Sequence, residues 1–372
     1  KMLFSFFTFQ KISTYHRNKG GGVRMFYQRE YWRRRQEEPS MLQIADLPSS
    51  ILQKYDLEIK DGQKTKKCWQ LKTNTGIYWL WEFEGNSEVL AEVLEWRADL
   101  GKKGVQEFLP LLQTKEGGNY VQGEQKAYYL TAKAKGTPFA PQHSSKFLQV
   151  VAALAKLHNY SQSLAVKEQH EPKESIGSVW LKAYQEKLTE LLFFYHYLID
   201  KRLLNDYERL YVESFENFYA RGQEAIQKMA LACCSAENDC VPSFLVGNFL
   251  PDNLLETEKG VVFLETTCGR KGYAIQDLTH FLKMYLPFKK WDGDLAKTIL
   301  THYQEEVDLN NQEKLMLLAQ LSFPGRYCFY AEQYFYGGED VNVLINQLKN
   351  YLYEISRQDC CLAELRKWLL GV

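Results

Sequence analysis

The stretch that decides the fold is VGNFLPDN, residues 246–253. It lies within a strand predicted at 243–255, which a Glu-Lys-Gly turn at 258–260 joins to a second strand at 261–264, so the sequence predicts a small β-hairpin. The sequence around this hairpin predicts helices, at 145–158, 179–197 and 207–234 before it and in most of the remaining chain after it. We therefore expect a functional loop where the hairpin interrupts the helices.

The residues before Gly136 have a strand-like pattern. Residues 68–72 alternate between apolar and polar, and residues 77–83 (IYWLWEF) predict an aromatic-rich second strand. Further short strands are predicted near 120–121 and at 127–132. A β-rich region therefore precedes the helical one.

One helix interrupts this β-rich region, at residues 87–100. We expect Ser87 to cap this helix, because a hydroxyl at that position can accept a hydrogen bond from a free backbone N–H. The residues expected on one apolar face are Val89, Val93, Trp96 and Leu100. The domain prediction is an extension at 1–44, a β-rich lobe at 45–136 and a helical lobe at 137–372.

The composition allows a large core and argues against a polyanionic partner. Lys+Arg and Asp+Glu are both 46, so the formal net charge is zero and no global field would hold a nucleic acid or an anionic membrane. No run of about 18 apolar residues predicts a membrane span. The eight cysteines include no C-x-x-C pair, which favours reduced thiols and no metal site.

The first residues suggest a hypothesis about the natural start. The Lys-Gly-Gly-Gly run at 19–22 is what a translated purine-rich ribosome-binding site would encode. Met25 or Met41 would then be the start, and the residues before it would lie outside the fold.

The loop and its surroundings resemble the aminoglycoside-phosphotransferase-like family. In that family the loop reads His-Gly-Asp, four residues, Asn, and the next strand ends in an acidic Asp-Phe-Asp. Here Asn253 lies five residues after Asn248, Glu265 ends the next strand, and Gly272 and Asp277 follow at the family's spacing.

Two further segments resemble the same family. Residues 154–158 (LAKLH) look like its helix ahead of the loop, and residues 128–136 (YYLTAKAKG) resemble its hinge strand and terminal glycine. The resemblance covers roughly residues 45–360. It implies an α+β, protein-kinase-like bilobal fold, with a small antiparallel β lobe containing one helix and a larger, mainly helical lobe.

Within this family the chain is similar to the CotS-type spore coat proteins of Bacillus-like bacteria. Residues 51–57 (ILQKYDL) resemble their opening segment. The later order of a strand after a Gly turn, a helix and a Leu-Pro-Leu-Leu segment at 109–112 also resembles theirs.

The position of the phosphate-binding lysine holds an aromatic residue. The family pattern Gly-x-Tyr-x-Leu-Lys aligns with GIYWLW at 76–81, which places Trp81 at the lysine position. Phosphoryl transfer in this fold depends on cations that position and neutralise the phosphates. An indole has no charge and would fill the space of the α and β phosphates; Lys72 could substitute only by reaching across from the next strand.

The catalytic loop also departs from the family. Asn248 occupies the position of the base, and a carboxamide cannot accept the proton, which forfeits about 10²–10⁴ in rate. Val246 replaces the histidine that props the loop, and Glu265 replaces the metal-binding aspartate. Glu265 and Asn253 could still bind Mg²⁺ weakly as a residual site, since magnesium keeps several waters.

The remaining polar residues have a structural interpretation. We expect Asn253, Glu265 and Asp277 to hold the loop through hydrogen bonds to the backbone. We expect His158 to be a hydrogen-bonding histidine at a helix end and not a metal ligand.

The resemblance therefore implies a non-catalytic, kinase-like (pseudokinase) spore coat protein that acts in sporulation through protein–protein contacts. Its expected partners are other coat proteins, with no nucleic acid and no membrane, and its expected location is the mother-cell cytoplasm and then the spore coat. No cofactor is expected. The alternatives are an atypical small-molecule phosphotransferase of the aminoglycoside- or choline-kinase type, with weakly bound ATP and Mg²⁺, or a nucleotide- or sugar-binding sensor.

Overall fold

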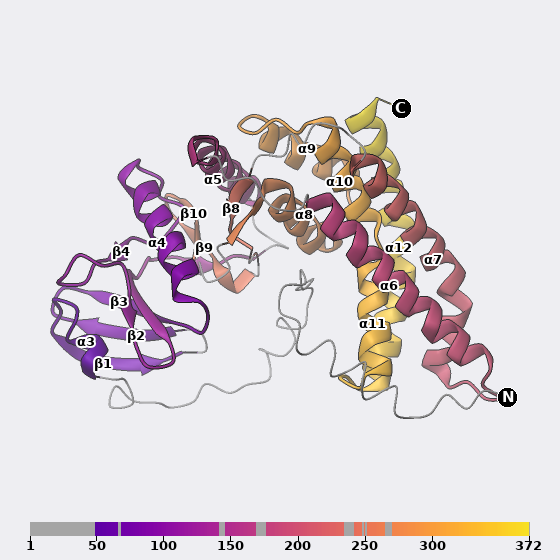
Figure 1. The fold of residues 1–372 in the computed structure, drawn as a ribbon, viewed down its shortest axis with the longest axis horizontal. Helices are drawn as coiled ribbons and strands as arrows, with labels where there is room; N and C mark the ends of the chain where they lie inside the picture. The colour runs from indigo at the N-terminus through magenta and orange to yellow at the C-terminus, as the bar shows by residue number, and fades with distance from the viewer. Residues whose placement is uncertain are drawn as a thin grey trace.

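The computed structural model describes residues 49–65, 68–140, 146–168, 176–233, 242–247, 249, 251–264 and 270–371. Figure 1 shows a sheet with helix α4 at one end of the molecule, long helices at the other end, and short strands between them. The prediction of an α+β, bilobal fold is confirmed. The predicted extension at 1–44 lies outside the described residues.

The first lobe is an antiparallel sheet with the strand order β1-β2-β3-β6-β4, in which β5 also pairs with β6. Its elements are α3 (Ser49–Leu52), β1 (Ile59–Lys64), β2 (Cys68–Thr73), β3 (Ile77–Phe83), α4 (Ser87–Lys102), β4 (Leu111–Leu112), β5 (Val121–Gln122) and β6 (Ala127–Ala132). The predicted strands at 68–72, 77–83 and 127–132 are confirmed.

Helix α4 forms where it was predicted, but its cap and its buried face differ from the prediction. The N-cap is Asn86, whose side chain accepts a hydrogen bond from the backbone N–H of Glu88, and Ser87 is the first helical residue. Val89 is 42% exposed. The buried side chains are Leu90, Val93, Leu94, Trp96, Arg97 and Leu100.

The sheet has an apolar cluster on each of its two faces because side chains alternate along each strand. One face carries Trp69, Leu71 and Leu80, which pack with Ile51 and Tyr55 at the start of the described chain. The other face carries the residues that pack with helix α4 and with two residues of the second lobe: Cys68, Trp81, Ala127 and Tyr129.

The second lobe is mainly helical and contains the largest core cluster. Its elements are β7 (Thr137–Pro138), α5 (Phe147–Glu168), α6 (Ile176–Ile199), α7 (Asp206–Cys233), β8 (Pro242–Leu245), η2 (Pro251–Asn253), β9 (Leu254–Thr257), β10 (Gly260–Phe263), β11 (Arg270–Tyr273), α8 (Ala274–Tyr285), η3 (Pro287–Lys289), α9 (Gly293–Gln304), α10 (Asn311–Ser322), α11 (Gly325–Phe335) and α12 (Val341–Leu370). The hairpin forms as β9–β10, with Val261 opposite Glu256, but the strand predicted at 243–255 is divided into β8, the loop with η2, and β9. β8 pairs instead with β11.

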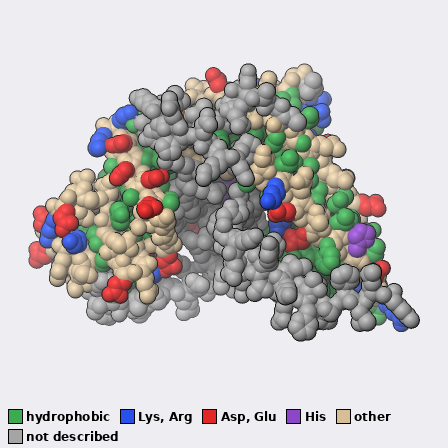
Figure 2. Space-filling view, in the orientation of Figure 1, with side chains coloured by type: hydrophobic (Ala, Val, Ile, Leu, Met, Phe, Trp, Pro, Cys, Tyr) green, Lys and Arg blue, Asp and Glu red, His purple; other side chains and the backbone are tan. Residues whose placement is uncertain are grey.

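The surface carries charges of both signs. Figure 2 shows acidic and basic side chains interspersed at both ends of the face it draws. Among the described residues, no helix has the length and apolar character needed to cross a membrane.

The two lobes are joined at the hinge and at a second contact. After β6 the chain runs into β7, which pairs with β9, and the backbone N–H of Phe139 donates to the carbonyl oxygen of Leu254 at 3.0 Å. Separately, the N–H of Phe263 donates to the carbonyl oxygen of Glu107, in the segment after α4, at 2.8 Å. The Phe139–Leu254 bond therefore fixes the hinge to β9 within the second lobe, and the Phe263–Glu107 bond connects the two lobes.

Gly136 permits the close approach at the hinge. A Cβ atom on this residue would lie 2.4 Å from the carbonyl oxygen of Glu256, and that oxygen belongs to the backbone of β9 and cannot rotate away. The hinge and β9 would have to separate to accommodate any side chain.

We therefore expect Gly136→Ala to lower the free energy of unfolding by about 1–3 kcal/mol, the usual cost of overpacking. The matched control is Gly101→Ala in α4, where an added Cβ meets nothing within 4 Å and alanine is the better helix former. Urea unfolding monitored by tryptophan fluorescence measures both. A Gly136→Ala midpoint equal to that of the wild type would refute this account of the hinge.

Candidate functional site

The loop at 246–253 is held by a buried carboxylate in the following helix. Asp277, in the first turn of α8, accepts hydrogen bonds from the N–H groups of Val246 at 2.6 Å and Gly247 at 3.0 Å. Its side chain is buried, so both carboxylate oxygens are used inside the protein. The prediction that Asp277 holds the loop through the backbone is confirmed.

His158 connects this carboxylate to a tyrosine. The Nε2 atom of His158 lies 3.2 Å from Asp277 Oδ2, and Nδ1 lies 2.8 Å from the hydroxyl of Tyr303 on α9. Burial raises the pKa of Tyr303 well above its ordinary value, so its hydroxyl stays protonated and can donate. In the neutral imidazole, Nε2–H then donates to the carboxylate and Nδ1 accepts from Tyr303. The prediction that His158 forms hydrogen bonds is confirmed, but its place at a helix end is wrong, because α5 continues to Glu168.

Separate hydrogen bonds hold the second half of the loop, at residues 249–253. The Phe249 ring is buried in the main core, and its carbonyl oxygen accepts a hydrogen bond from the Tyr285 hydroxyl. The carbonyl oxygen of Asn253 accepts from the N–H of Leu264 at 2.8 Å, and the side chain of Asn253 is buried. The loop and the end of β10 therefore lie next to each other, as the resemblance implied.

The predicted base and metal positions, Asn248 and Glu265, lie outside the described residues. Their flanking residues, Gly247, Phe249 and Leu264, are described and have the contacts given above. The side chain of Val246 is buried in the main core. Its backbone N–H donates to Asp277. Among the described residues, no three His, Cys, Asp or Glu side chains gather as a possible metal site.

Trp81 is packed and hydrogen-bonded at the position assigned to the lysine. Its indole Nε1 donates to Thr131 Oγ1 at 3.0 Å, and its ring stacks on Tyr129 with centroids 6.2 Å apart. The same cluster contains Leu255 and Leu264 of the second lobe. Apolar side chains from both lobes therefore meet around Trp81.

Helix α4 presents leucines to this cluster. Leu90 and Leu94 belong to the same cluster as Trp81. The three glutamates of the helix, Glu88, Glu92 and Glu95, are exposed. Where α4 packs on the sheet it therefore presents Leu90 and Leu94, and its three glutamates lie at exposed positions.

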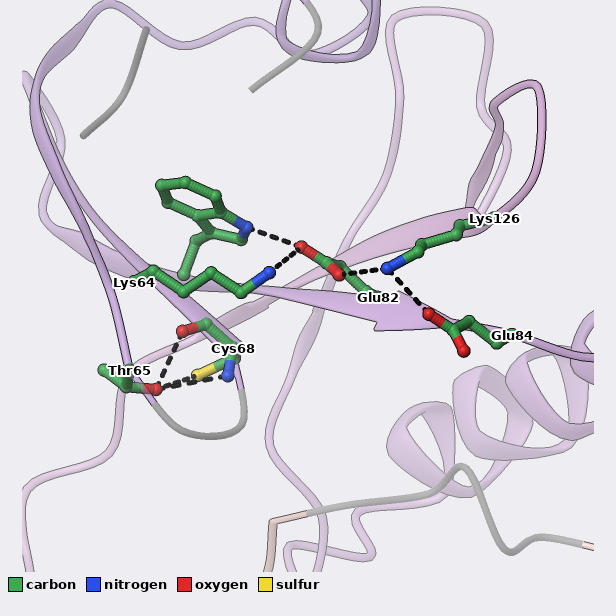
Figure 3. Close-up of polar contacts among 7 residues, drawn as sticks. Lys64, Thr65, Cys68, Glu82, Glu84 and Lys126 are labelled. Atoms are coloured by element: carbon green, nitrogen blue, oxygen red, sulfur yellow. Dashed lines mark hydrogen bonds and ion pairs between the residues drawn. The ribbon is translucent and has the colours of Figure 1, made fainter. Parts of the chain in front are cut away.

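The residue after Trp81 fixes the orientation of β3. Figure 3 shows the Glu82 carboxylate between Lys64 and Lys126, with ion-pair distances of 2.6 and 3.0 Å. Trp69 Nε1 also donates to it at 2.6 Å. Because neighbouring strand residues point to opposite faces, these contacts place Glu82 on one face of the sheet and Trp81 on the other.

The pKa of Glu82 reflects these partners. Burial alone would raise the pKa of this carboxyl, but the hydrogen bonds from Lys64, Trp69 and Lys126 outweigh it and lower the pKa to about 2. Both lysines therefore serve an ion-pair cluster on the face of the sheet opposite to Trp81.

Lys72 does not reach the region of Trp81. It pairs with Ile77 in the sheet, whereas Trp81 pairs with Cys68. Its ammonium binds the exposed Asp61 carboxylate at 3.0 Å. The possibility that Lys72 reaches across to Trp81 is not realised in this structure.

The structure adds a buried cation that the sequence did not predict. Arg97 on α4 is 3% exposed, its guanidinium donates to the carbonyl oxygen of Leu109 at 2.7 Å, and it lies 5.2 Å from the Phe108 ring. Burial lowers the pKa of Arg97 to about 10. The signal in the sequence was its spacing, because Arg97 lies four residues after Val93 and three before Leu100, on the predicted apolar face of the helix.

A small antiparallel sheet with one helix, a hinge that ends in glycine, and a loop held by an aspartate of the next helix together define a kinase-like phosphotransferase fold. Residues 48–239 match the family described as "Spore coat putative kinase YutH". The chain belongs to this family of kinase-like spore coat proteins. The matched region ends before the loop at 246–253.

Other known proteins are similar to this chain. Spore coat protein S of Bacillus subtilis (strain 168) is 23% identical over 297 residues, which are 77% of this chain and 84% of that protein. The crystal structure of an aminoglycoside phosphotransferase from Alicyclobacillus acidocaldarius has a TM-score of 0.76 and 19% identity, and covers 88% of this chain and 97% of its own. Spectinomycin phosphotransferase has a TM-score of 0.54 and 12% identity, over 83% of this chain and 95% of its own.

We expect Asp277→Asn to lower the free energy of unfolding by about 2–4 kcal/mol, because one amide oxygen cannot replace two charged acceptors for buried N–H groups. Asp292→Asn is the matched control, since Asp292 caps α9 with one oxygen and asparagine caps equally well. Urea unfolding gives the free energies, and hydrogen exchange should show lost protection at Val246 and Gly247. Unchanged exchange at these two amides would contradict the role given to Asp277.

We expect Glu82→Gln to destabilise the protein by about 1–2 kcal/mol at pH 7 and progressively less as the pH falls. The folded pKa of Glu82 lies below its unfolded value, so its stabilisation is present above about pH 4.5 and disappears as the pH falls toward 2. Urea unfolding at several pH values measures the difference in the free energy of unfolding between variant and wild type, called the gap below. Glu84→Gln, which removes an exposed partner of the same Lys126, should give a small gap throughout. A Glu82→Gln gap that stays constant with pH would refute the ion-pair interpretation.

Proposed function

We propose that this chain is a non-catalytic member of the kinase-like family that serves in the spore coat through contacts with other coat proteins. The observation that carries the proposal is the packing of Trp81, at the lysine position, in one apolar cluster with Leu90 and Leu94 of α4. In protein kinases, the lysine of the corresponding strand must pair with a glutamate of the following helix.

An indole in place of the lysine and leucines in place of its glutamate partner are compatible with each other in stability. A buried ion pair can be replaced by well-packed apolar residues at little or no cost in stability, whereas removing only one charge leaves the other unpaired. Here the indole and the leucines occupy both sides, and the glutamates of α4 are exposed. Restoring one charge alone would therefore bury an unpaired ion.

The surroundings of Trp81 also argue against a nucleotide cofactor. Leu255 and Leu264 of the second lobe pack in the cluster with Trp81 and Tyr129. An incoming triphosphate would have to displace apolar side chains and would meet an indole in place of an ammonium group. We propose that the protein uses no cofactor; the alternative is weak binding of ATP and Mg²⁺ through Asn253 and Glu265.

Protein contacts are favoured by apolar side chains exposed on the helical lobe. Phe193 and Tyr197 lie one turn apart on α6 and are 52% and 50% exposed, and Leu203 is 87% exposed. Figure 2 shows hydrophobic side chains at the surface of this end of the molecule. Exposed apolar patches often mark interaction sites. The family and Spore coat protein S support a location on the spore coat, which we propose is reached from the mother-cell cytoplasm.

We expect no phosphate transfer from ATP and Mg²⁺ to aminoglycoside, choline or other amine and hydroxyl acceptors. Asn248→Asp alone should remain inactive, because a restored base still lacks the cation that grips the phosphates. A coupled phosphate-release assay, with an active aminoglycoside phosphotransferase as its control, measures turnover. Millimolar ATP with Mg²⁺, or ADP, should leave the melting temperature unchanged. Turnover by the wild type or by Asn248→Asp would refute the proposal, and a nucleotide-dependent shift without turnover would favour the sensor alternative.

The coat assignment is tested in a strain that lacks the gene. Full-length wild type and Asn248→Ala should both restore coat morphology and spore resistance, since the proposal assigns no role to the base position. Failure of Asn248→Ala with normal protein levels would instead favour an enzyme.

A further inference from the structure

A large groove lies away from the loop at 246–253, where the hinge, the segment after α4, helix α5 and the β9–β10 turn meet. Its volume is about 1730 Å³. Pockets for small ligands usually measure about 300–1,000 Å³. The groove therefore has room for a polypeptide segment.

The charge of the groove is positive although the chain as a whole is neutral. Six of its lining side chains are cationic and three are carboxylates. Lys135, Lys156 and Lys259 are exposed, and none of the three forms an ion pair within the described part of the chain. An occupant with carboxylates would complement these three ammonium groups.

One wall of the groove is formed by β4, whose outer edge pairs with no other strand in the described part of the chain. The N–H of Ala132 donates to the carbonyl oxygen of Pro110, so these two residues form a hydrogen-bonded pair of the antiparallel ladder. Leu111, opposite Thr131, is the next residue along and therefore turns its N–H and C=O away from β6. Leu111 lines the groove.

A second strand edge borders the same groove. The N–H of Phe263 donates to Glu107 and not to β9, so Phe263 and Leu254 form a non-hydrogen-bonded pair of the β9–β10 ladder. Val261, two residues earlier, has the same orientation and turns its N–H and C=O away from β9. Val261 also lines the groove, but it is 4% exposed. The same edge is bridged by Phe108 at Phe263, so Leu111 offers the more accessible edge.

We propose that this groove binds an extended, acidic segment of a partner polypeptide, whose backbone pairs with a strand edge and whose carboxylates meet Lys135, Lys156 and Lys259. Addition of a strand provides affinity through backbone hydrogen bonds, and alternate side chains of the added strand provide specificity. The inference rests on the part of the proposed function that assigns protein contacts to this chain, and it names one such surface. It is independent of turnover, so a binding assay can fail while the phosphate-release assay still supports a non-catalytic role.

The experiment measures fluorescence anisotropy of a short labelled peptide of alternating Glu and Thr with the full-length chain. The double variant Lys156→Glu with Lys259→Glu should weaken binding about tenfold at moderate salt. The matched control is Lys60→Glu with Lys349→Glu, two exposed lysines outside the groove, which should change binding less than about twofold. Circular dichroism melts check that both variants are folded.

Two further peptides separate backbone pairing from simple charge attraction. N-methylation of alternate backbone nitrogens should weaken binding about tenfold, because it removes donors to the strand edge. A peptide with Lys in place of Glu should not bind. Equal binding of the methylated peptide, equal loss in the two double variants, or no saturable binding of the acidic peptide would each overturn the proposal.

Competing occupants give distinct results. If tripolyphosphate displaced the peptide from the groove at equal charge concentration, the groove would be a small-anion site and the proposal would be wrong. If sedimentation showed a dimer that the Lys156 and Lys259 double variant abolishes, the groove would bind a second copy of this chain instead. A monomer that binds the peptide and resists tripolyphosphate supports the acidic segment.

Discussion

The loop at 246–253 depends on one buried carboxylate. Asp277 receives the N–H groups of Val246 and Gly247 and faces His158, which in turn contacts Tyr303. A buried N–H without an acceptor is costly, so the loop keeps its path only while this acceptor is present. The arrangement needs no metal, nucleotide or substrate to be satisfied. These hydrogen bonds therefore stabilise the loop whether or not the loop takes part in catalysis.

The region around Trp81 is packed with apolar side chains from β3, β6, α4 and the second lobe. A lysine at this position requires a carboxylate partner inside the protein, and the side of α4 toward the sheet provides Leu90 and Leu94 instead. Replacing both members of a buried ion pair by apolar groups preserves stability, whereas replacing one does not. The nearby cations Lys64 and Lys126 are bound to Glu82 on the opposite face. These two cations therefore lie on the face of the sheet opposite to the apolar cluster around Trp81.

The sequence predicted what depends on local pattern and missed what depends on distant contacts. Strands β2, β3 and β6 and helix α4 follow from alternation and helical periodicity, because these patterns reflect burial within one element. The cap of α4 is Asn86 and not Ser87, a one-residue shift that either polar side chain could satisfy. Tyr303 contacts His158 across 145 residues, and no short-range pattern encodes such a pairing. The positions of Asn248 and Glu265 rest on motif spacing alone.

The connections between the lobes also bear on the proposed role. Kinases and related phosphotransferases work through opening and closure of the cleft. Here the N–H of Phe263 binds Glu107 in the first lobe, the N–H of Phe139 binds Leu254 beside the hinge, and Leu255 and Leu264 are buried in the same cluster as Trp81. Opening would break the Phe263–Glu107 bond and expose the apolar cluster to water, at about 25 cal/mol for each Å² of apolar surface. These contacts hold the two lobes together beside the hinge, next to the groove proposed to bind an acidic segment.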